Sequence, residues 1–178
     1  MDTPVLRMME EKDAACYRAL FLTALKESPE RFEVTLEEAE SRDLSSYAAE
    51  LRTGDGLGCF FGSELVGMVF LRRVASGKSR HRGSITKFYV DSGFRGRRIA
   101  YALLTLAGEV ARHRNISQLE LLVSSTAARA RDFYAAAGFR ETGLIPNAIM
   151  DGGKRLDLFL MVLDLQADAA EALRPTGS

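Results

Sequence analysis

The chain is poor in the residues that mark several classes of protein. Only two of its 178 residues are cysteines, Cys16 and Cys59, and no Cys-x-x-Cys motif or cysteine/histidine cluster is present. A disulfide framework and a zinc site are therefore disfavoured, and no metal is indicated. No segment approaches the ~20 apolar residues that span a bilayer, and charged residues at 10–13 interrupt any signal-like stretch. We expect a soluble, cytoplasmic protein without a membrane partner.

The chain also lacks a net charge, which disfavours a nucleic-acid partner. Its 24 basic residues balance 24 acidic ones, and no zinc-finger or RNA-binding signature is present. The charges are nevertheless segregated. Residues 72–98 carry nine Lys or Arg and one acid, whereas residues 27–50 carry eight acids and two Arg. The first window favours an anionic ligand and the second a cationic one, although both are also compatible with ordinary solvated faces.

The apolar residues predict one core and an alternation of strands and helices. With 47% apolar residues, we expect a single domain over residues 1–165 and a frayed tail over 166–178. The pattern predicts strands at 5–9, 57–61, 65–71, 85–90, 119–123, 139–145 and 156–163. It predicts helices at 12–26 and 36–52, from Ile99 to Asn115, and from a cap at Ser124, Ser125 or Thr126 to Gly138. The third helix is the clearest, because Ile99, Leu103, Leu106 and Val110 follow at spacings of four, three and four.

The most informative segment is residues 90–104, where a turn rich in glycine and arginine joins an apolar strand to an amphipathic helix. The first turn of a helix leaves about four backbone N–H groups without internal partners. The helix dipole makes that end partly positive, so a phosphate or pyrophosphate would fit there.

Two segments resemble the signatures of the GCN5-related N-acetyltransferase (GNAT) family. In residues 85–104, the positions of the family motif Arg/Gln-x-x-Gly-x-Gly/Ala are held by Arg95, Arg98 and Ala100. Residues 119–143 resemble the family's strand, Asn-x-x-Ala-x-x-x-Tyr helix and Gly-Phe turn, through Ala127, Ala130, Phe133, Tyr134, Gly138 and Phe139. The resemblance implies an α/β GNAT acyl-CoA N-acyltransferase fold. Its mixed, mostly antiparallel sheet would have about seven strands and about four flanking helices.

The resemblance also implies a cofactor site for acetyl-CoA as acyl donor. In this fold the strands ending at Val90 and Val123 splay apart and leave backbone groups without ladder partners. Those of Phe88, Tyr89 and Val90 would face the pantetheine arm and acyl group, with an oxyanion-binding N–H near Tyr89 or Val90. The pyrophosphate would be held by the amides of Arg95, Gly96, Arg97, Arg98, Ile99 and Ala100.

Tyr134 is the residue that the resemblance assigns to chemistry. A phenol with a pKa near ~10 is protonated at neutral pH and can give its proton to a departing CoA thiolate. The alternative is a core tyrosine packed beside Phe133. The implied reaction is direct attack of a primary amine on the thioester in a ternary complex.

The chain departs from the family pattern at several positions. Arg98 stands where glycine is usual and requires its side chain to turn outward, and Ala127 replaces a common asparagine. Residues 84–89 contain no carboxylate, so the general base stays open, with candidates at Glu33, Glu37, Glu38 and Asp157. The basic residues Arg73, Lys78, Arg80 and Arg82 either reach the adenosine phosphates or form a flexible loop. His81 and His113 are expected to be exposed.

The function expected from these residues is N-acetyl transfer from acetyl-CoA to a primary amine. The alternative is a catalytically silent acyl-CoA-binding module. A nucleotide-binding protein of another α/β type is disfavoured, because neither a Gly-x-x-x-x-Gly-Lys-Ser/Thr nor a Gly-x-Gly-x-x-Gly run is present. The acceptor, the acyl chain length and the oligomeric state are left open, with a homodimer compatible with the family.

Overall fold

The computed structural model describes residues 3–166, so the predicted tail at 166–178 lies almost wholly outside the described residues. The helices are α1 (Ala14–Glu27), α2 (Leu36–Ser41), α3 (Leu44–Leu51), α4 (Ile99–His113) and α5 (Ala128–Ala136). The strands are β1 (Val5–Met8), β2 (Gly56–Phe61), β3 (Glu64–Arg73), β4 (Arg82–Val90), β5 (Gln118–Ser124), β6 (Arg140–Asp151) and β7 (Lys154–Asp164). Within the described residues, no helix is both long and apolar enough to cross a membrane.

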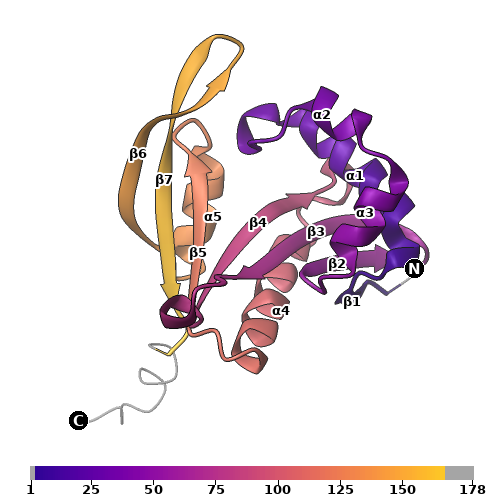
Figure 1. Cartoon of the computed structure of the whole chain (residues 1–178), viewed down its shortest axis with the longest axis horizontal. Helices are drawn as coiled ribbons and strands as arrows, with labels where there is room; N and C mark the ends of the chain where they lie inside the picture. Colours follow the sequence, from indigo (N-terminus) through magenta and orange to yellow (C-terminus); the bar gives the residue numbers. More distant parts are fainter. Residues whose placement is uncertain (1–2, 167–178) are drawn as a thin grey trace.

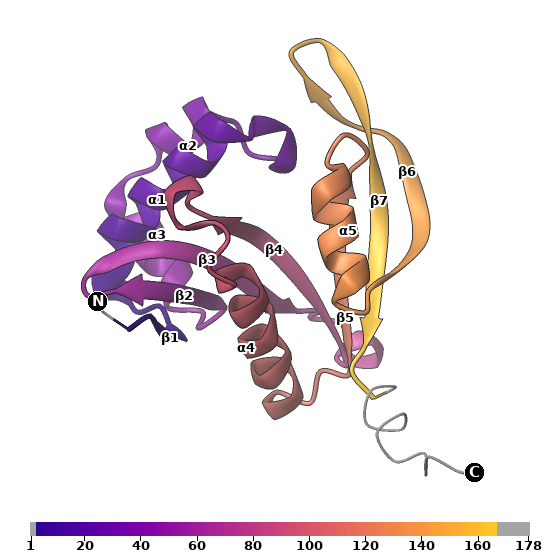
Figure 2. The same cartoon turned by 180° about the vertical axis from the view of Figure 1, so that it is seen from behind.

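One mixed, mostly antiparallel sheet of seven strands organises the chain, as the sequence predicts. The strand order is β1-β2-β3-β4-β5-β7-β6, and only the β4/β5 pair is parallel. Helices α1, α2 and α3 cover one face of the first half of the sheet, and α4 and α5 lie on the other face (Figures 1 and 2). Two hydrophobic cores result, one against α4 and α5 and the other beneath α1 and α3.

The two middle strands diverge, and this divergence creates the site. Strands β4 and β5 pair only where Arg82, Gly83 and Ser84 face residues 118–120. Beyond that ladder β4 stays with β3 and β5 stays with β7, so the gap between β4 and β5 widens toward their C-terminal ends (Figure 1). The splay implied by the family resemblance is therefore present.

Three details correct the expectations from sequence. The helix predicted over 36–52 is two helices, because Arg42 is extended and the Asp43 side chain caps α3 by accepting from the Ser46 N–H at 2.8 Å. The N-cap of α5 is Ala127, so the predicted cap at Ser124, Ser125 or Thr126 is wrong. On α4, Leu106 and Val110 are only half-buried, because the centre of its buried face is shifted by one residue; its buried residues are Ile99, Leu103, Leu104, Ala107, Gly108 and Ala111.

Candidate active site in the strand splay

Two cavities open where β4 and β5 diverge. The first, of about 230 Å³, is lined by β4, β5 and the loop at residues 31–34. The second, of about 270 Å³, is lined by the end of β4, the start of α4 and one face of α5. The cavities share four lining residues, which are Arg31, Phe88, Ala130 and Tyr134. The splay therefore offers two adjoining chambers that meet at these residues.

The glycine- and arginine-rich turn has free backbone amides beside the second cavity, which Arg95 and Ala100 line. Gly96 and Arg98 have positive φ values of 79° and 61°, which bends the chain sharply into the first turn of α4. Within residues 3–166, the N–H groups of residues 96–101 donate to no protein acceptor. Arg98 is exposed, so its side chain turns outward as its position in the motif requires. The Arg95 N–H instead closes a bond to the Ser92 carbonyl at 3.4 Å, so the free amides begin at Gly96.

A carboxylate that the sequence did not reveal anchors this turn. Glu27, the last residue of α1, accepts hydrogen bonds from the Tyr89 hydroxyl (2.8 Å), the Ser92 hydroxyl (2.8 Å) and the Arg95 guanidinium (2.9 Å). The hydrogen bond from Tyr89, followed by that from Ser92, holds the pKa of Glu27 below its ordinary value. Arg95 also donates to the Val90 carbonyl at 3.3 Å. The Arg95 side chain therefore supports the turn from within.

Tyr134 stands at the junction of the cavities within an aromatic cluster. Its ring lies 5.9 Å from that of Phe88, 5.3 Å from that of Phe133 and 5.7 Å from that of Phe139. Its hydroxyl has no protein hydrogen-bond partner within the described residues, and no fully buried side-chain oxygen there is left unpartnered. The hydroxyl is therefore open to the cavity. Burial raises the pKa of this phenol, and the nearby charge of Arg31 opposes the rise only in part, so the phenol is protonated at neutral pH.

Most of the other predicted cofactor residues line a cavity, whereas some can contact a ligand only through their backbone groups. Phe88 lines both cavities, and Tyr89, Val90, Arg95 and Ala100 line the second. The side chain of Ile99 is buried in the core, so this residue can offer only its backbone. Ala127 lines the first cavity without the amide side chain that the family often places there.

Of the four carboxylates considered as general bases, Glu33 is the one that lines a cavity. Glu37 and Glu38 lie on α2, where the Glu38 carboxylate accepts from the Thr35 N–H at 2.8 Å. Asp157 accepts from the Asn147 N–H at 2.8 Å and stabilises the irregular part of β6. Glu38 and Asp157 thus have structural partners away from the cavity.

The basic residues from Arg73 to Arg82 lie between the end of β3 and the start of β4. The turn that we expect to bind pyrophosphate follows the other end of β4. Arg82 begins β4 and Val90 ends it, which separates the two ends by roughly 25 Å. Arg82 is also paired with Glu120 at 2.7 Å. This separation of the strand ends disfavours contact between Arg73, Lys78, Arg80 or Arg82 and a pyrophosphate held at the turn, and both interpretations of these residues stay predictions. His81 and His113 are exposed, as expected.

Two cations near the second cavity escaped the sequence analysis. Arg31 follows Pro29 in a 3-10 turn that faces the splay, and Arg129 lies in the first turn of α5. Both belong to segments in which no charge pattern singles them out. No group of three or more His, Cys, Asp or Glu among residues 3–166 could hold a metal ion.

Comparisons with known proteins agree on one family. A family model described as the Acetyltransferase (GNAT) family matches residues 14–139. The ribosomal-protein-alanine N-acetyltransferase from Brucella melitensis is 23% identical, with a TM-score of 0.79 over 90% of this chain and 99% of that chain. A GNAT-family acetyltransferase from Streptococcus pneumoniae is 21% identical, with a TM-score of 0.76 over 90% of this chain and 98% of that one.

A third solved structure contains a ligand. The acetyltransferase yncA from Salmonella typhimurium, solved with its cofactor acetyl-CoA, is 17% identical, with a TM-score of 0.80 over 92% of this chain and 94% of that one. These likenesses establish the fold. No curated protein matches the sequence.

Proposed function

The chain belongs to the acetyltransferase (GNAT) family, and from that premise we propose that it transfers an acetyl group from acetyl-CoA to a primary amine. The observation that carries the proposal is the meeting of two cavities at Tyr134. Such an arrangement lets a donor enter from the turn and an acceptor from the other side. Both substrates are then present together, as direct transfer in a ternary complex requires.

The second cavity supports the donor part of this proposal. The free amides of residues 96–101 and the N-terminus of α4 suit the pyrophosphate of acetyl-CoA. Arg31 and Arg129 add positive charge to the same cavity. The pantetheine arm would lie in the splay, where the backbone of Phe88, Tyr89 and Val90 can offer it hydrogen bonds. The acetyl-CoA complex of the Salmonella relative supports this choice of donor.

Tyr134 would act as the general acid. The amine nitrogen attacks the thioester carbonyl carbon, and a backbone N–H near Tyr89 or Val90 stabilises the oxyanion. When the C–S bond breaks, the thiolate takes the proton of the Tyr134 hydroxyl, and the phenolate regains a proton from solvent. Because burial raises the pKa of this phenol, the hydroxyl carries its proton at neutral pH and has it available when the thiolate forms.

The acceptor would enter the first cavity, which also offers the carboxylate for proton removal. A primary amine that arrives as an ammonium ion must lose one proton before its nitrogen can attack, and the nitrogen loses a second proton after the C–N bond forms. Glu33 lines this cavity and can accept such a proton directly or through water. The strand itself offers no carboxylate over residues 84–89.

The test is release of CoA thiol on mixing the protein, acetyl-CoA and a panel of small amines, amino acids and peptide N-termini. We expect at least one amine to accelerate thiol release, with an acetylated product that mass spectrometry identifies. A folded protein that binds acetyl-CoA but accelerates no member of the panel would instead support a catalytically silent acyl-CoA-binding module. The missing strand carboxylate and Ala127 are the observations that favour this second candidate.

A further inference from the structure

Strand β4 contains a bulge that includes Phe88, the residue of this strand that lines both cavities. Phe70 of β3 pairs with Thr86, and Met68 pairs with Tyr89. Two β4 residues, Lys87 and Phe88, therefore lie opposite the single β3 residue between these pairs. Lys87 has a φ of +49°, so its backbone is left-handed.

The bulge decides which way the next side chains face. Ile85 packs in the core on the α4 side of the sheet, and strict alternation from it would turn Phe88 and Val90 toward α1. Instead Phe88 and Val90 pack on the α4 side, and Tyr89 packs beneath α1. The extra residue thus reverses the alternation. It places Phe88 at both cavities and brings the Tyr89 hydroxyl to Glu27.

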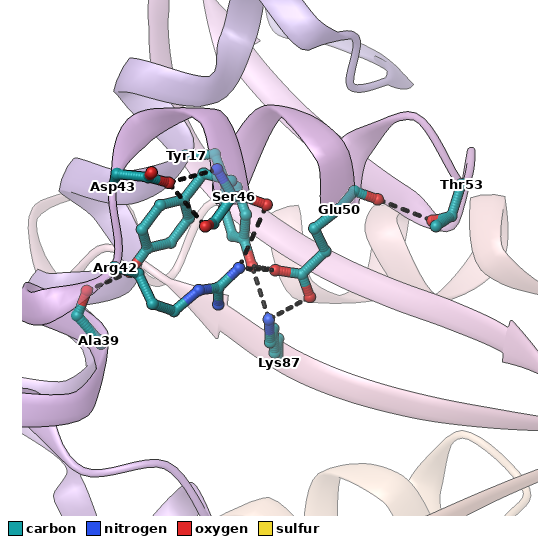
Figure 3. Close-up of polar contacts among 9 residues, drawn as sticks. Tyr17, Ala39, Arg42, Asp43, Ser46, Glu50, Thr53 and Lys87 are labelled. Atoms are coloured by element: carbon teal, nitrogen blue, oxygen red, sulfur yellow. Dashed lines mark hydrogen bonds and ion pairs between the residues drawn. The ribbon is translucent and has the colours of Figure 1, made fainter.

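A buried polar cluster holds the side chain of the bulge residue. The Lys87 ammonium donates to the Tyr17 hydroxyl at 2.7 Å and is ion-paired with Glu50 of α3 (Figure 3). Tyr17 and Arg42 each donate to the same Glu50 carboxylate at 3.0 Å. We name these four residues the Lys87 clamp.

The clamp lies in a setting where its contacts are strong. Tyr17 is fully buried, and the side chains of Glu50 and Lys87 are only 14% and 17% exposed. Lys87 also lies 4.7 Å from the ring centre of Phe21 and 5.0 Å from that of Phe70. Charged hydrogen bonds in such surroundings are less screened than surface pairs.

The backbone at Lys87 needs this support. A side chain at positive φ carries a steric cost, and bulges of this kind usually place glycine at the left-handed residue. Within the part of the chain that the structure describes, Lys87 is one of four non-glycine residues with positive φ. Its contacts with Glu50 and Tyr17 offset the cost and hold the bulge at one position along the strand.

We infer that Lys87 is a positioning residue, which through its clamp fixes the bulge and thereby aims Phe88, Tyr89 and Val90 at acetyl-CoA. This inference rests on the proposed function, because it assumes that Phe88, Tyr89 and Val90 contact acetyl-CoA. Lys87 lines the first cavity and not the second, and its clamp holds it from the face of β4 where α1 and α3 lie.

Variants of Lys87, compared with one control variant, separate positioning from general stability. Lys87→Met keeps the length of the side chain but removes the ammonium, whereas Lys87→Gly accepts the positive φ without cost and lacks the clamp. Arg7→Met is the matched control. It breaks another partly buried ion pair, with Asp13 at 2.6 Å, on β1, which two strands separate from β4.

Acetyl-CoA binding is measured by calorimetry on each variant, well below its unfolding temperature. We expect Lys87→Met to raise Kd about tenfold, as for the loss of one charged hydrogen bond, and Lys87→Gly to raise it less. Lys87→Arg, which keeps a cation, should recover most of the affinity. A Kd within about twofold of wild type for folded Lys87→Met would overturn the inference, as would an equal loss in Arg7→Met.

A second readout needs no ligand. Amide hydrogen exchange over residues 86–90 should accelerate in Lys87→Met and stay at the wild-type rate in Arg7→Met. Equal exchange in the two variants would refute the clamp, whatever the protein binds. A wild-type protein that fails to bind acetyl-CoA would instead refute the proposed function, so the two failures are distinguishable.

Discussion

We call β1 to β4 the polar half of the sheet and β5 to β7 the aromatic half, because the two contact their helices through different kinds of interaction. Strands β1 to β4 are tied to α1 and α3 by ion pairs and charged hydrogen bonds, at Glu27, at Asp13 and at the Lys87 clamp. On the α5 side of the aromatic half, an aromatic cluster centres on Tyr134 and Phe139, and Arg131 adds one ion pair with Glu141 of β6 at 4.0 Å. A ladder of three residue pairs joins the halves.

This difference matches the two tasks that we propose. The polar half must hold a charged pyrophosphate. Its charged side chains position the turn before α4 and leave the backbone N–H groups of residues 96–101 free to donate. The aromatic half must keep a phenol protonated at neutral pH, and burial among aromatic rings raises the pKa of that phenol. Variants in the two halves should therefore fail in different ways.

The largest effect is expected in the aromatic half. Tyr134→Phe removes one hydroxyl that has no protein partner among residues 3–166, so the free energy of unfolding should change by less than about 0.5 kcal/mol. Loss of the general acid should lower kcat about 100-fold with an accepted amine, while the Kd for acetyl-CoA stays unchanged. Steady-state kinetics and calorimetry measure the two quantities. Full turnover under conditions where chemistry is rate-limiting would rule out Tyr134 as the acid.

In the polar half, loss of Glu27 should affect the donor and spare the chemistry. Glu27→Gln weakens the bonds to Tyr89, Ser92 and Arg95, so we expect the Kd for acetyl-CoA to rise about fivefold to tenfold. Removal of a negative charge near phosphates would by itself tighten binding. Glu109→Gln on the exposed side of α4 controls for charge alone. Tighter binding by Glu27→Gln would show that the carboxylate does not position the turn.

The polar half should also be the acid-sensitive one. The hydrogen bond from Arg7 lowers the pKa of Asp13 below its ordinary value of 3.8, even though burial opposes the shift. A carboxylate with a lowered folded pKa stabilises the fold above its unfolded pKa, and this stability is lost as the pH falls through the folded pKa. Asp13→Asn should therefore cost about 1 kcal/mol near neutral pH and almost nothing well below pH 3.8.

Urea unfolding of Asp13→Asn on both sides of that pH measures the difference. Phe139→Leu in the aromatic half is the control, since a cost of roughly 1 kcal/mol there should be similar at both pH values. A cost of Asp13→Asn that does not change with pH would mean that the ion pair with Arg7 contributes nothing to stability.

The smallest expected effect concerns the turn between the halves. Arg98 has a φ of +61°, so Arg98→Gly should relieve backbone strain and raise the free energy of unfolding by about 0.5 kcal/mol, after the entropy cost of glycine. Arg97→Gly, in the same turn but without a positive φ, should instead lower it. Urea denaturation of the two variants measures their free energies of unfolding. A destabilised Arg98→Gly would mean that the Arg98 side chain makes a stabilising contact.

Contiguous patterns were enough to predict the sheet, α4 and the turn before it. The helix from Ile99 onward and the terminator Gly138 are local features and are confirmed, although the buried face of α4 is shifted by one residue from the predicted spacing. The break between α2 and α3 falls within the polar residues 40–43 and was missed because apolar residues resume on both sides of it. Asp43 is a preferred N-cap residue type and was the available signal.

The missed parts of the site depend on contacts between distant residues. Glu27 meets its partners across 62 to 68 residues, and no local pattern marks such a carboxylate. The bulge at Lys87 was equally hidden, because glycine is the residue that usually signals a left-handed bulge position. Only the fold brings Lys87 to Glu50, 37 residues away.

The most direct test of the central claim is calorimetric titration of the purified protein with acetyl-CoA, beside ATP and NAD. We predict selective binding of acetyl-CoA, because the free amides suit its pyrophosphate and the splay suits its pantetheine arm. Folded protein that binds no acetyl-CoA, or binds ATP or NAD equally well, would contradict a donor site between β4 and β5.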